Sequence, residues 1–172
     1  MNHPALLERF VLKHGVEFRG VKRPKGVRKR KMKECFKNST YGLWEKYEWD
    51  YYEGYAMNKR IAFPFLHAWN VKDGVLIDTT LVDPEEYEYI GVKFTQEQIW
   101  KEQLKTGVYG MLDIGMINLE LLRSIDNELV EEGLRIHRNR GVHLGGEGPS
   151  TGTGHTDLGS VDGSSGSESS TN

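Results

Sequence analysis

The feature that most constrains the fold is a pair of apolar runs separated by a single turn. Residues 63–71 and 75–80 flank Asp73-Gly74, and an Asp-Gly pair between two such runs is typical of a β-hairpin with a two-residue turn. Because side chains alternate between the two faces of a strand, the length of this turn decides which side chains of the hairpin meet.

A two-residue turn places four side chains on one face of the hairpin. In that register Trp69 lies opposite Asp78, and His67 lies opposite Thr80. His67 and Asp78 are then diagonal neighbours, within reach of a side-chain contact at about 7–8 Å between backbones. A three-residue turn would place them on opposite faces.

The rest of the pattern predicts helices and further strands around this hairpin. Thr95 and Gln98 form a capping box, which predicts a helix that ends at Gly107. The other expected elements are a helix before Gly15, a loop over residues 19–33, a short helix over 33–43, strands over 49–57 and 87–94, and a helix over 117–138. Leu119, Leu122, Ile125, Leu129 and Ile136 are expected to form the buried face of that last helix. This order predicts an α+β domain with an antiparallel sheet and packed helices.

The C-terminal part of the chain has a different composition from the rest. Residues 141–172 contain nine Gly and seven Ser, and their apolar side chains are Val142, Leu144, Leu158 and Val161. Such a segment buries too little apolar surface to offset the entropy cost of ordering it. We therefore predict a single folded domain over residues 1–140, followed by a disordered tail over 141–172.

Composition excludes several classes of protein. A single cysteine among 172 residues rules out an internal disulfide framework and a four-thiolate zinc site. No paired ligand spacing among the histidines predicts any other metal site, and no cofactor is expected. No run approaches the ~18–20 apolar residues of a membrane span, and the first residues lack the pattern of a secretory signal. The sequence thus predicts a cytoplasmic protein that does not enter a membrane.

The positive charge of the chain is concentrated in one segment. Residues 19–33 hold nine Lys or Arg and no acid, whereas the rest carries 14 basic and 25 acidic residues, a balance of −11. The nine cations are Arg19, Lys22, Arg23, Lys25, Arg28, Lys29, Arg30, Lys31 and Lys33. Such density indicates either a solvated loop that lowers the pKa of a nearby thiol or a surface that binds nucleic acid or an acidic protein.

The lone cysteine is a candidate nucleophile. Cys35 follows the nine cations directly and lies near an expected helix start, and both features lower the pKa of a thiol. Glu34 opposes that effect. A cysteine nucleophile also needs a base and a group that orients the base, and His67 and Asp78 are the candidates for these roles.

These residues carry a resemblance to a known superfamily. The series Cys35, Tyr52-Glu53-Gly54-Tyr55, Leu66-His67-Ala68-Trp69-Asn70-Val71 and Leu76-Ile77-Asp78-Thr79-Thr80 resembles the core of the transglutaminase-like, papain-like cysteine enzymes. The match covers residues 33–94, and its continuation over 88–94 is similar to small uncharacterised phage and bacterial proteins. The resemblance implies a Cys35-His67-Asp78 triad with the Cys35 N–H as one oxyanion donor, and host cytoplasm as the location if the protein is phage-encoded.

The chain departs from the superfamily pattern at two places. Lys33-Glu34-Cys35-Phe36 replaces the usual Gly-x-Cys-Trp, and Thr79 follows Asp78 where proline is common. The second oxyanion donor is unassigned. Asn38, one helical turn after Cys35, together with Glu53 and Trp69, is a candidate supporting residue.

Two functions follow from the sequence. The first is a cysteine-dependent acyl-transfer enzyme (a peptidase, amidase or transglutaminase-like protein) acting on a peptide or amide without a cofactor. The alternative is a non-enzymatic module on the same fold that binds a polyanion through residues 19–33. Each candidate residue also has a structural interpretation: Cys35 as a small buried hydrophobe, His67 as a core histidine, and Asp78 as a strand-end acceptor.

Overall fold

The computed structural model describes residues 4–46, 48–112 and 118–142. The helices are α1 (Pro4–His14), α2 (Cys35–Glu45), α3 (Gln96–Thr106) and α4 (Leu119–Val142), with a short 3-10 helix, η1, at Pro84–Glu86. The strands are β1 (Val16–Arg19), β2 (Asp50–Asn58), β3 (Pro64–Lys72), β4 (Val75–Ile77) and β5 (Tyr87–Phe94). The α+β class with an antiparallel sheet is therefore confirmed.

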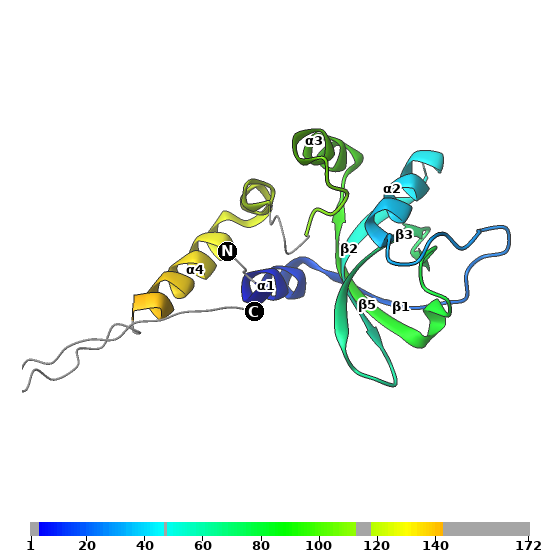
Figure 1. Cartoon of the computed structure of the whole chain (residues 1–172), viewed down its shortest axis with the longest axis horizontal. Helices are drawn as coiled ribbons and strands as arrows, with labels where there is room; N and C mark the ends of the chain where they lie inside the picture. Colours follow the sequence, from blue (N-terminus) through cyan, green and yellow to red (C-terminus); the bar gives the residue numbers. More distant parts are fainter. Residues whose placement is uncertain (1–3, 47, 113–117, 143–172) are drawn as a thin grey trace, which may run out of the picture.

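The five strands form one antiparallel sheet in the order β1-β5-β2-β3-β4. Consecutive strands β2, β3 and β4 are neighbours, while β5 returns to the other side of β2 and β1 pairs with β5. β2 is therefore the central strand. The sheet is curled, and the loop that joins β1 to α2 lies on the opposite side of the molecule from α1 and α4 (Figure 1).

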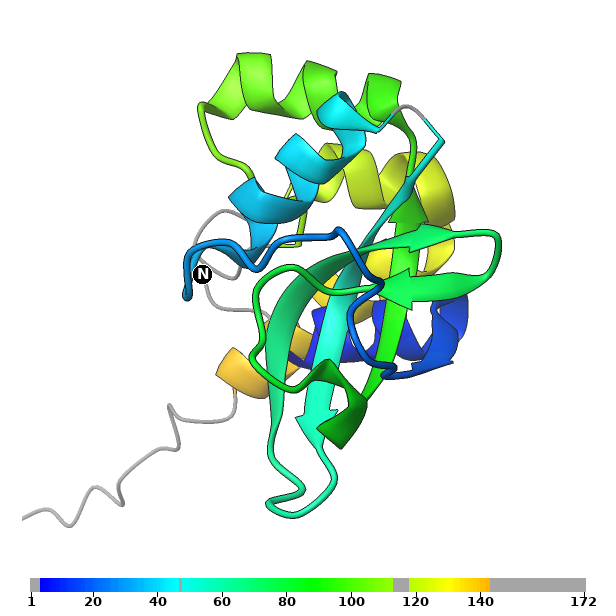
Figure 2. The same cartoon turned by 90° about the vertical axis from the view of Figure 1, so that its right-hand side faces the viewer.

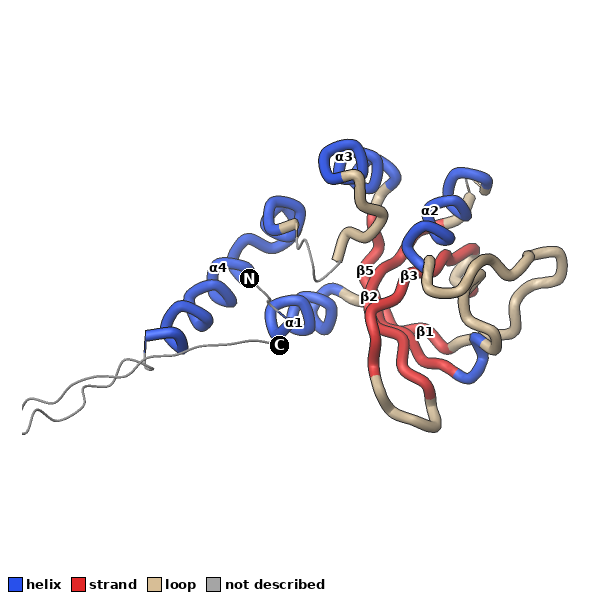
Figure 3. Tube along the Cα trace, viewed as in Figure 1, coloured by secondary structure: helices blue, strands red, loops and turns tan. Residues whose placement is uncertain are grey.

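The two faces of the sheet bury different side chains. One face packs against all four helices, with Phe10, Ile99 and Leu122 from the helices meeting Tyr51 and Phe94 from the strands. Among the described residues, no long helix covers the other face, which is rich in aromatic side chains. Its buried members are Tyr52, Ala56, Trp69, Val71, Leu76 and Tyr89. Figure 2 shows α2 and α3 crossing one end of the sheet, and Figure 3 shows that the segment between β1 and α2 is a loop.

Two local signals of the sequence are confirmed in full. Lys72 pairs with Val75, so Asp73-Gly74 is a two-residue turn, and both residues have the positive φ that such a turn requires, at 51° and 77°. In α3, Thr95 and Gln98 exchange both hydrogen bonds of the capping box, and Gly107 ends the helix in the left-handed conformation.

Several expectations are corrected by the structure. β1 was not predicted, because four residues with little burial carry no periodic signal. β4 ends at Ile77, three residues earlier than expected. Ile136 is 40% exposed rather than buried, and α4 is broken at Asp126, where φ is −151°. Exact strand ends and helix breaks depend on tertiary contacts that a periodic pattern does not encode.

The predicted disordered tail falls mostly on residues 143–172, which lie outside the described residues; its first two positions, 141 and 142, belong to α4. Within the described residues, no helix is long and apolar enough to cross a membrane.

Candidate active site

The hairpin brings His67 and Asp78 into direct contact. β4 pairs with β3 only through Val75–Ile77 opposite Asn70–Lys72, so the chain leaves the sheet at Asp78. From there the Asp78 carboxylate turns back along β3, and its Oδ2 lies 2.7 Å from Nε2 of His67. The side chains are 2% exposed for His67 and 0% for Asp78. The diagonal contact expected from a two-residue turn is thus present.

Asp78 is surrounded by hydrogen-bond donors. The backbone N–H groups of Thr80 and Leu81 donate to Oδ1 at 2.7 and 3.0 Å, and the hydroxyl of Tyr89 donates to Oδ2 at 3.0 Å. Burial raises the pKa of Asp78, but the hydrogen bond and charge of His67 and the two backbone donors outweigh it and hold the pKa below its usual value. Asp78 is therefore a carboxylate rather than a carboxylic acid.

His67 lies between Asp78 and Cys35. Burial of the ring disfavours its charged form, but hydrogen bonding to Asp78 and to the Cys35 side chain, together with their charges, raises the pKa of His67 to about 9. With Nε2 facing Asp78, the other ring nitrogen remains for the thiol. The imidazole thus contacts the carboxylate of Asp78 on one side and the thiol of Cys35 on the other.

Cys35 is the first residue of α2 and is half-buried. Its N-cap residue, Glu34, makes no side-chain capping hydrogen bond. The Glu34 carboxylate instead pairs with Lys31, and this contact lowers the pKa of Glu34. The first N–H groups of a helix have no partner within the helix and carry partial positive charge. The thiol therefore lies in the favourable field of an N-terminus that Glu34 does not cap.

Close packing of α2 against β3 holds Cys35 at this position. Asn70 of β3 donates to the carbonyl of Ser39 at 3.0 Å. A Cβ on Gly42 would come within 2.4 Å of Oδ1 of Asn70, so the helix can approach the strand because residue 42 has no side chain. Asn38 is buried and donates to the carbonyl of Lys31 and to the hydroxyl of Thr80, at 2.7 and 2.9 Å.

The three candidate supporting residues have different surroundings. Asn38 ties α2 to the segment after Asp78. Trp69 lies on the same face as His67, with the two rings stacked at a centroid distance of 6.4 Å and 19° between planes. Gly91 provides room for this indole, because a Cβ there would lie 2.5 Å from Cη2 of Trp69.

Glu53 is fully buried on the helix-covered face of the sheet. It accepts hydrogen bonds from the Tyr51 hydroxyl at 2.5 Å and from the backbone N–H groups of Met111 and Leu112 at 2.7–2.9 Å. These contacts hold the segment after α3 against β2. Tyr51 in turn lies near enough to Cys35 for their charges to interact, and burial first of all, then Glu53, raises the pKa of this phenol.

The basic segment is anchored beside Asp78. The Arg23 guanidinium donates to the carbonyls of Asp78 and Leu81 at 2.9 and 2.5 Å, and the backbone N–H of Arg30 donates to the carbonyl of Thr79 at 2.6 Å. Arg30 and Lys31 also form ion pairs, with Glu45 and Glu34. Within the described residues the other cations of the segment have no ion pair and are exposed: Arg19, Lys22, Lys25, Arg28, Lys29 and Lys33.

Two residues that contact Asp78, Tyr89 and Arg23, were not predicted from the sequence to do so. Alternation along residues 87–94 gives the face on which Tyr89 lies, but the pairing of β5 with β2 decides that this face is the one holding His67. Burial, then the charge of Asp78, raises the pKa of Tyr89 well above its usual value, so its hydroxyl remains a donor.

No family model, no curated protein and no solved structure matches the chain.

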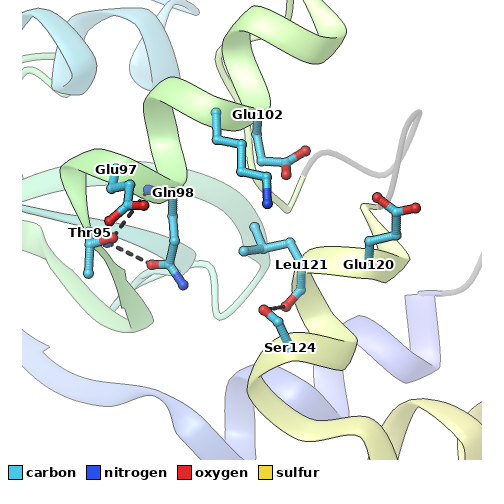
Figure 4. Close-up of a pocket in the computed structure, with 8 residues that line it drawn as sticks. Thr95, Glu97, Gln98, Glu102, Glu120, Leu121 and Ser124 are labelled. Carbon is cyan, nitrogen blue, oxygen red and sulfur yellow. Dashed lines mark hydrogen bonds between the residues drawn. The ribbon is translucent and has the colours of Figure 1, made fainter.

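Among the described residues, no group of three or more His, Cys, Asp or Glu side chains is arranged to hold a metal ion. A separate pocket of about 350 Å³ lies between α3 and α4, with Lys101 among its lining residues. Figure 4 shows Glu102 on α3 and Glu120 on α4 at this pocket. The candidate catalytic residues do not line that pocket.

Proposed function

We propose that the protein is a cysteine-dependent acyl-transfer enzyme with a transglutaminase-like, papain-like core. The observation that carries this proposal is the buried series of Cys35, His67 and Asp78, with an imidazole whose pKa is raised to about 9 between a carboxylate and a thiol at a helix N-terminus. The order of the three residues along the chain, and a nucleophile helix followed by antiparallel strands, also support it.

The reaction follows from this geometry. Below about pH 9 the proton of the Cys35–His67 pair is held on the imidazole, and the Cys35 thiolate attacks the carbonyl carbon of an amide to form a C–S bond while the carbonyl π electrons move to the oxygen. The C–N bond breaks as His67 returns that proton to the leaving amine. Water, or a second amine, then attacks the thioester while His67 takes its proton and passes it to the departing sulfur. Asp78 stays ionised throughout and stabilises the charged imidazole.

The oxyanion formed in each step needs hydrogen-bond donors. The N–H of Cys35 is one, because it is a first-turn N–H of α2 and the Glu34 side chain does not cap the helix. His67, Asp78 and Tyr89 are buried, which excludes water from the proton-transfer groups.

Alkylation of the native protein tests the proposal, because Cys35 is the single cysteine and any labelling reports on it. We expect iodoacetamide at pH 6 to label Cys35 at least about tenfold faster than glutathione, since the thiolate is the reacting species. H67Q is expected to remove that advantage. H14Q is the matched control: His14 also contacts an aspartate, but lies at the end of α1.

A fluorescent amine and a casein substrate then separate acyl transfer from hydrolysis, with C35A as the blank. The proposal fails if Cys35 labels no faster than glutathione and C35A retains the activity of the wild type.

Six exposed cations in residues 19–33 have no ion pair within the described part of the chain, and this favours a second candidate, a non-enzymatic module that binds a polyanion. Such binding to duplex or single-stranded nucleic acid would weaken steeply with salt and persist in C35A. An absence of binding at low salt rejects it.

A further inference from the structure

A pocket of about 470 Å³ lies beside the candidate active site and is lined by positive charge. The basic segment forms one wall with Arg28, Lys29 and Arg30, and Lys46, just after α2, contributes a fourth cation. Its acidic lining residue, Glu45, is paired with Arg30. The positive charge of Arg28, Lys29 and Lys46 is therefore left to attract an anion.

The same pocket is joined to the triad through the backbone. Thr79 lines it and directly follows Asp78. The N–H of Arg30 donates to the carbonyl of Thr79, while Arg23 holds the carbonyls on both sides of it. Thr79 is buried, and its hydroxyl has no hydrogen-bond partner among the described residues. An anion bound at this pocket would thus contact the segment that positions Asp78.

The basic segment then connects the pocket to the nucleophile. The chain runs from Arg30 through Lys31 to Cys35 at the start of α2. Asn38 of this helix holds the connection by donating a hydrogen bond to the carbonyl of Lys31. The pocket adjoins Glu45 at the other end of the same helix. An 11-residue helix is about 15 Å long, which an extended peptide spans with about four or five residues. Lys31 and Lys33, which directly precede α2, are exposed.

We infer that the substrate of this enzyme is an acidic segment of a protein, with a carboxylate side chain bound in this pocket about four or five residues from the carbonyl that Cys35 attacks. This inference rests on the proposed acyl-transfer function. Arginine and lysine side chains bind carboxylates through charge-assisted hydrogen bonds, and the acidic remainder of the chain would repel such a segment elsewhere. Residues 19–34 contain no aromatic side chain, and Trp49, which lines the pocket, is only 8% exposed. The site therefore offers no exposed platform for stacking bases, which single-stranded nucleic acid favours.

Reactive peptides test both the charge and the spacing. The probes are chloroacetyl-(Gly)n-Glu-Glu and chloroacetyl-(Gly)n-Gln-Gln, with n from zero to eight, and the measurement is the rate of Cys35 alkylation by mass spectrometry. For n near four we expect the Glu peptide to react at least about tenfold faster than the Gln peptide at low salt, because binding raises its local concentration. The advantage should shrink at high salt.

Two variants with the same change of net charge locate the effect. R28E/K29E alters the pocket, whereas K101E/R135E alters exposed cations on α3 and α4. The first should abolish the preference for Glu, and the second should keep it within about twofold. The ratio of the Glu-peptide rate to the Gln-peptide rate is taken within each variant, so any change in the reactivity of Cys35 itself, which iodoacetamide labelling measures, cancels. Matched circular dichroism spectra show that the fold is intact.

Equal rates for the two peptides at every n, or equal losses in the two variants, would overturn the inference. Stronger protection of Cys35 by a 12-nucleotide oligothymidylate than by a Glu-rich peptide of equal charge would also overturn it, in favour of nucleic acid. Failure of the acyl-transfer function itself is seen separately, in the iodoacetamide rate of the wild type.

Discussion

Two His–Asp pairs in the described part of the chain share one geometry and differ in their surroundings. In each, Nε2 of the histidine lies 2.7 Å from Oδ2 of the aspartate. The side chains of His67 and Asp78 are 2% and 0% exposed, whereas those of His14 and Asp126 are 25% and 9% exposed. The distance alone therefore does not distinguish them.

Their neighbours do distinguish them. Asp126 also binds Lys13 and accepts the N–H of Leu129, so it joins α1 to α4 and caps the part of α4 that follows the break. Hydrogen bonding to Lys13, then to Leu129 and His14, holds the pKa of Asp126 far below its usual value. Among the described residues Asp78 has no ion pair with a lysine, and its histidine lies next to the Cys35 thiol. The first arrangement ties helices together, and the second is the one that we propose moves a proton.

The largest expected effect comes from neutralising each aspartate in turn. D78N should lower the labelling rate of Cys35 and the turnover by about 100-fold or more, the usual contribution of a positioned acid–base group. D126N should leave both rates within about twofold. The comparison breaks if the two variants lose activity equally, as measured by iodoacetamide kinetics on variants with matched circular dichroism.

The pH dependence of stability provides the next test. The pKa of His67 is raised from 6.5 to about 9, so this group stabilises the fold fully below pH 6.5, and the stabilisation is lost as the pH rises through 9. From pH 6.5 to 9, the free energy of unfolding should fall by on the order of 3 kcal/mol more in the wild type than in H67Q. Urea denaturation at each pH measures it, and parallel curves for the two proteins would contradict it.

Asp78 affects the stability of the fold with a pH dependence opposite to that of His67, and its effect appears at acid pH. Because its pKa is lowered from 3.8, its stabilisation is present above that value and is lost as the pH falls through the lower, folded-state pKa.

Turnover should also decline above about pH 9, as His67 loses the proton that it gives to the leaving amine.

Removal of the Tyr89 hydroxyl should have a smaller effect on stability and turnover than the changes above. Y89F takes away the donor that lies 3.0 Å from Oδ2 of Asp78 and should cost about 1 kcal/mol in the free energy of unfolding, with a few-fold loss of turnover. Y87F is the matched control, because Tyr87 is half-buried two residues earlier on the same strand. Equal effects of the two variants in urea denaturation would remove Tyr89 from the site.

The smallest effect is expected at the structural pair. H14Q should lower the free energy of unfolding by about 1 kcal/mol or less, because the pair is partly exposed and Lys13 still neutralises Asp126. Thermal unfolding measures this change. A loss of Cys35 labelling in H14Q, without unfolding, would show that α1 and α4 act on the site.

The sequence determined the local parts of this site. Asp73-Gly74 fixed the turn, the turn fixed the register, and the register placed His67 and Asp78 on one face. Thr95 and Gly107 likewise determined the ends of α3. Each of these features depends on side chains within a few residues of one another, where propensity and hydrogen bonding are local.

Tertiary structure decided what lies further apart in the chain. The sequence alone did not show β1 beside β5, Tyr89 beside Asp78, the anchoring of Arg23 next to the site, or the pairing of His14 with Asp126. These contacts arise from the packing of whole strands and helices, in which one register or crossing is selected by the fit of many side chains at once. The sequence therefore determined the His67–Asp78 contact, because that contact is local to one hairpin, and the packing of α2 against β3 decided that Cys35 lies beside His67.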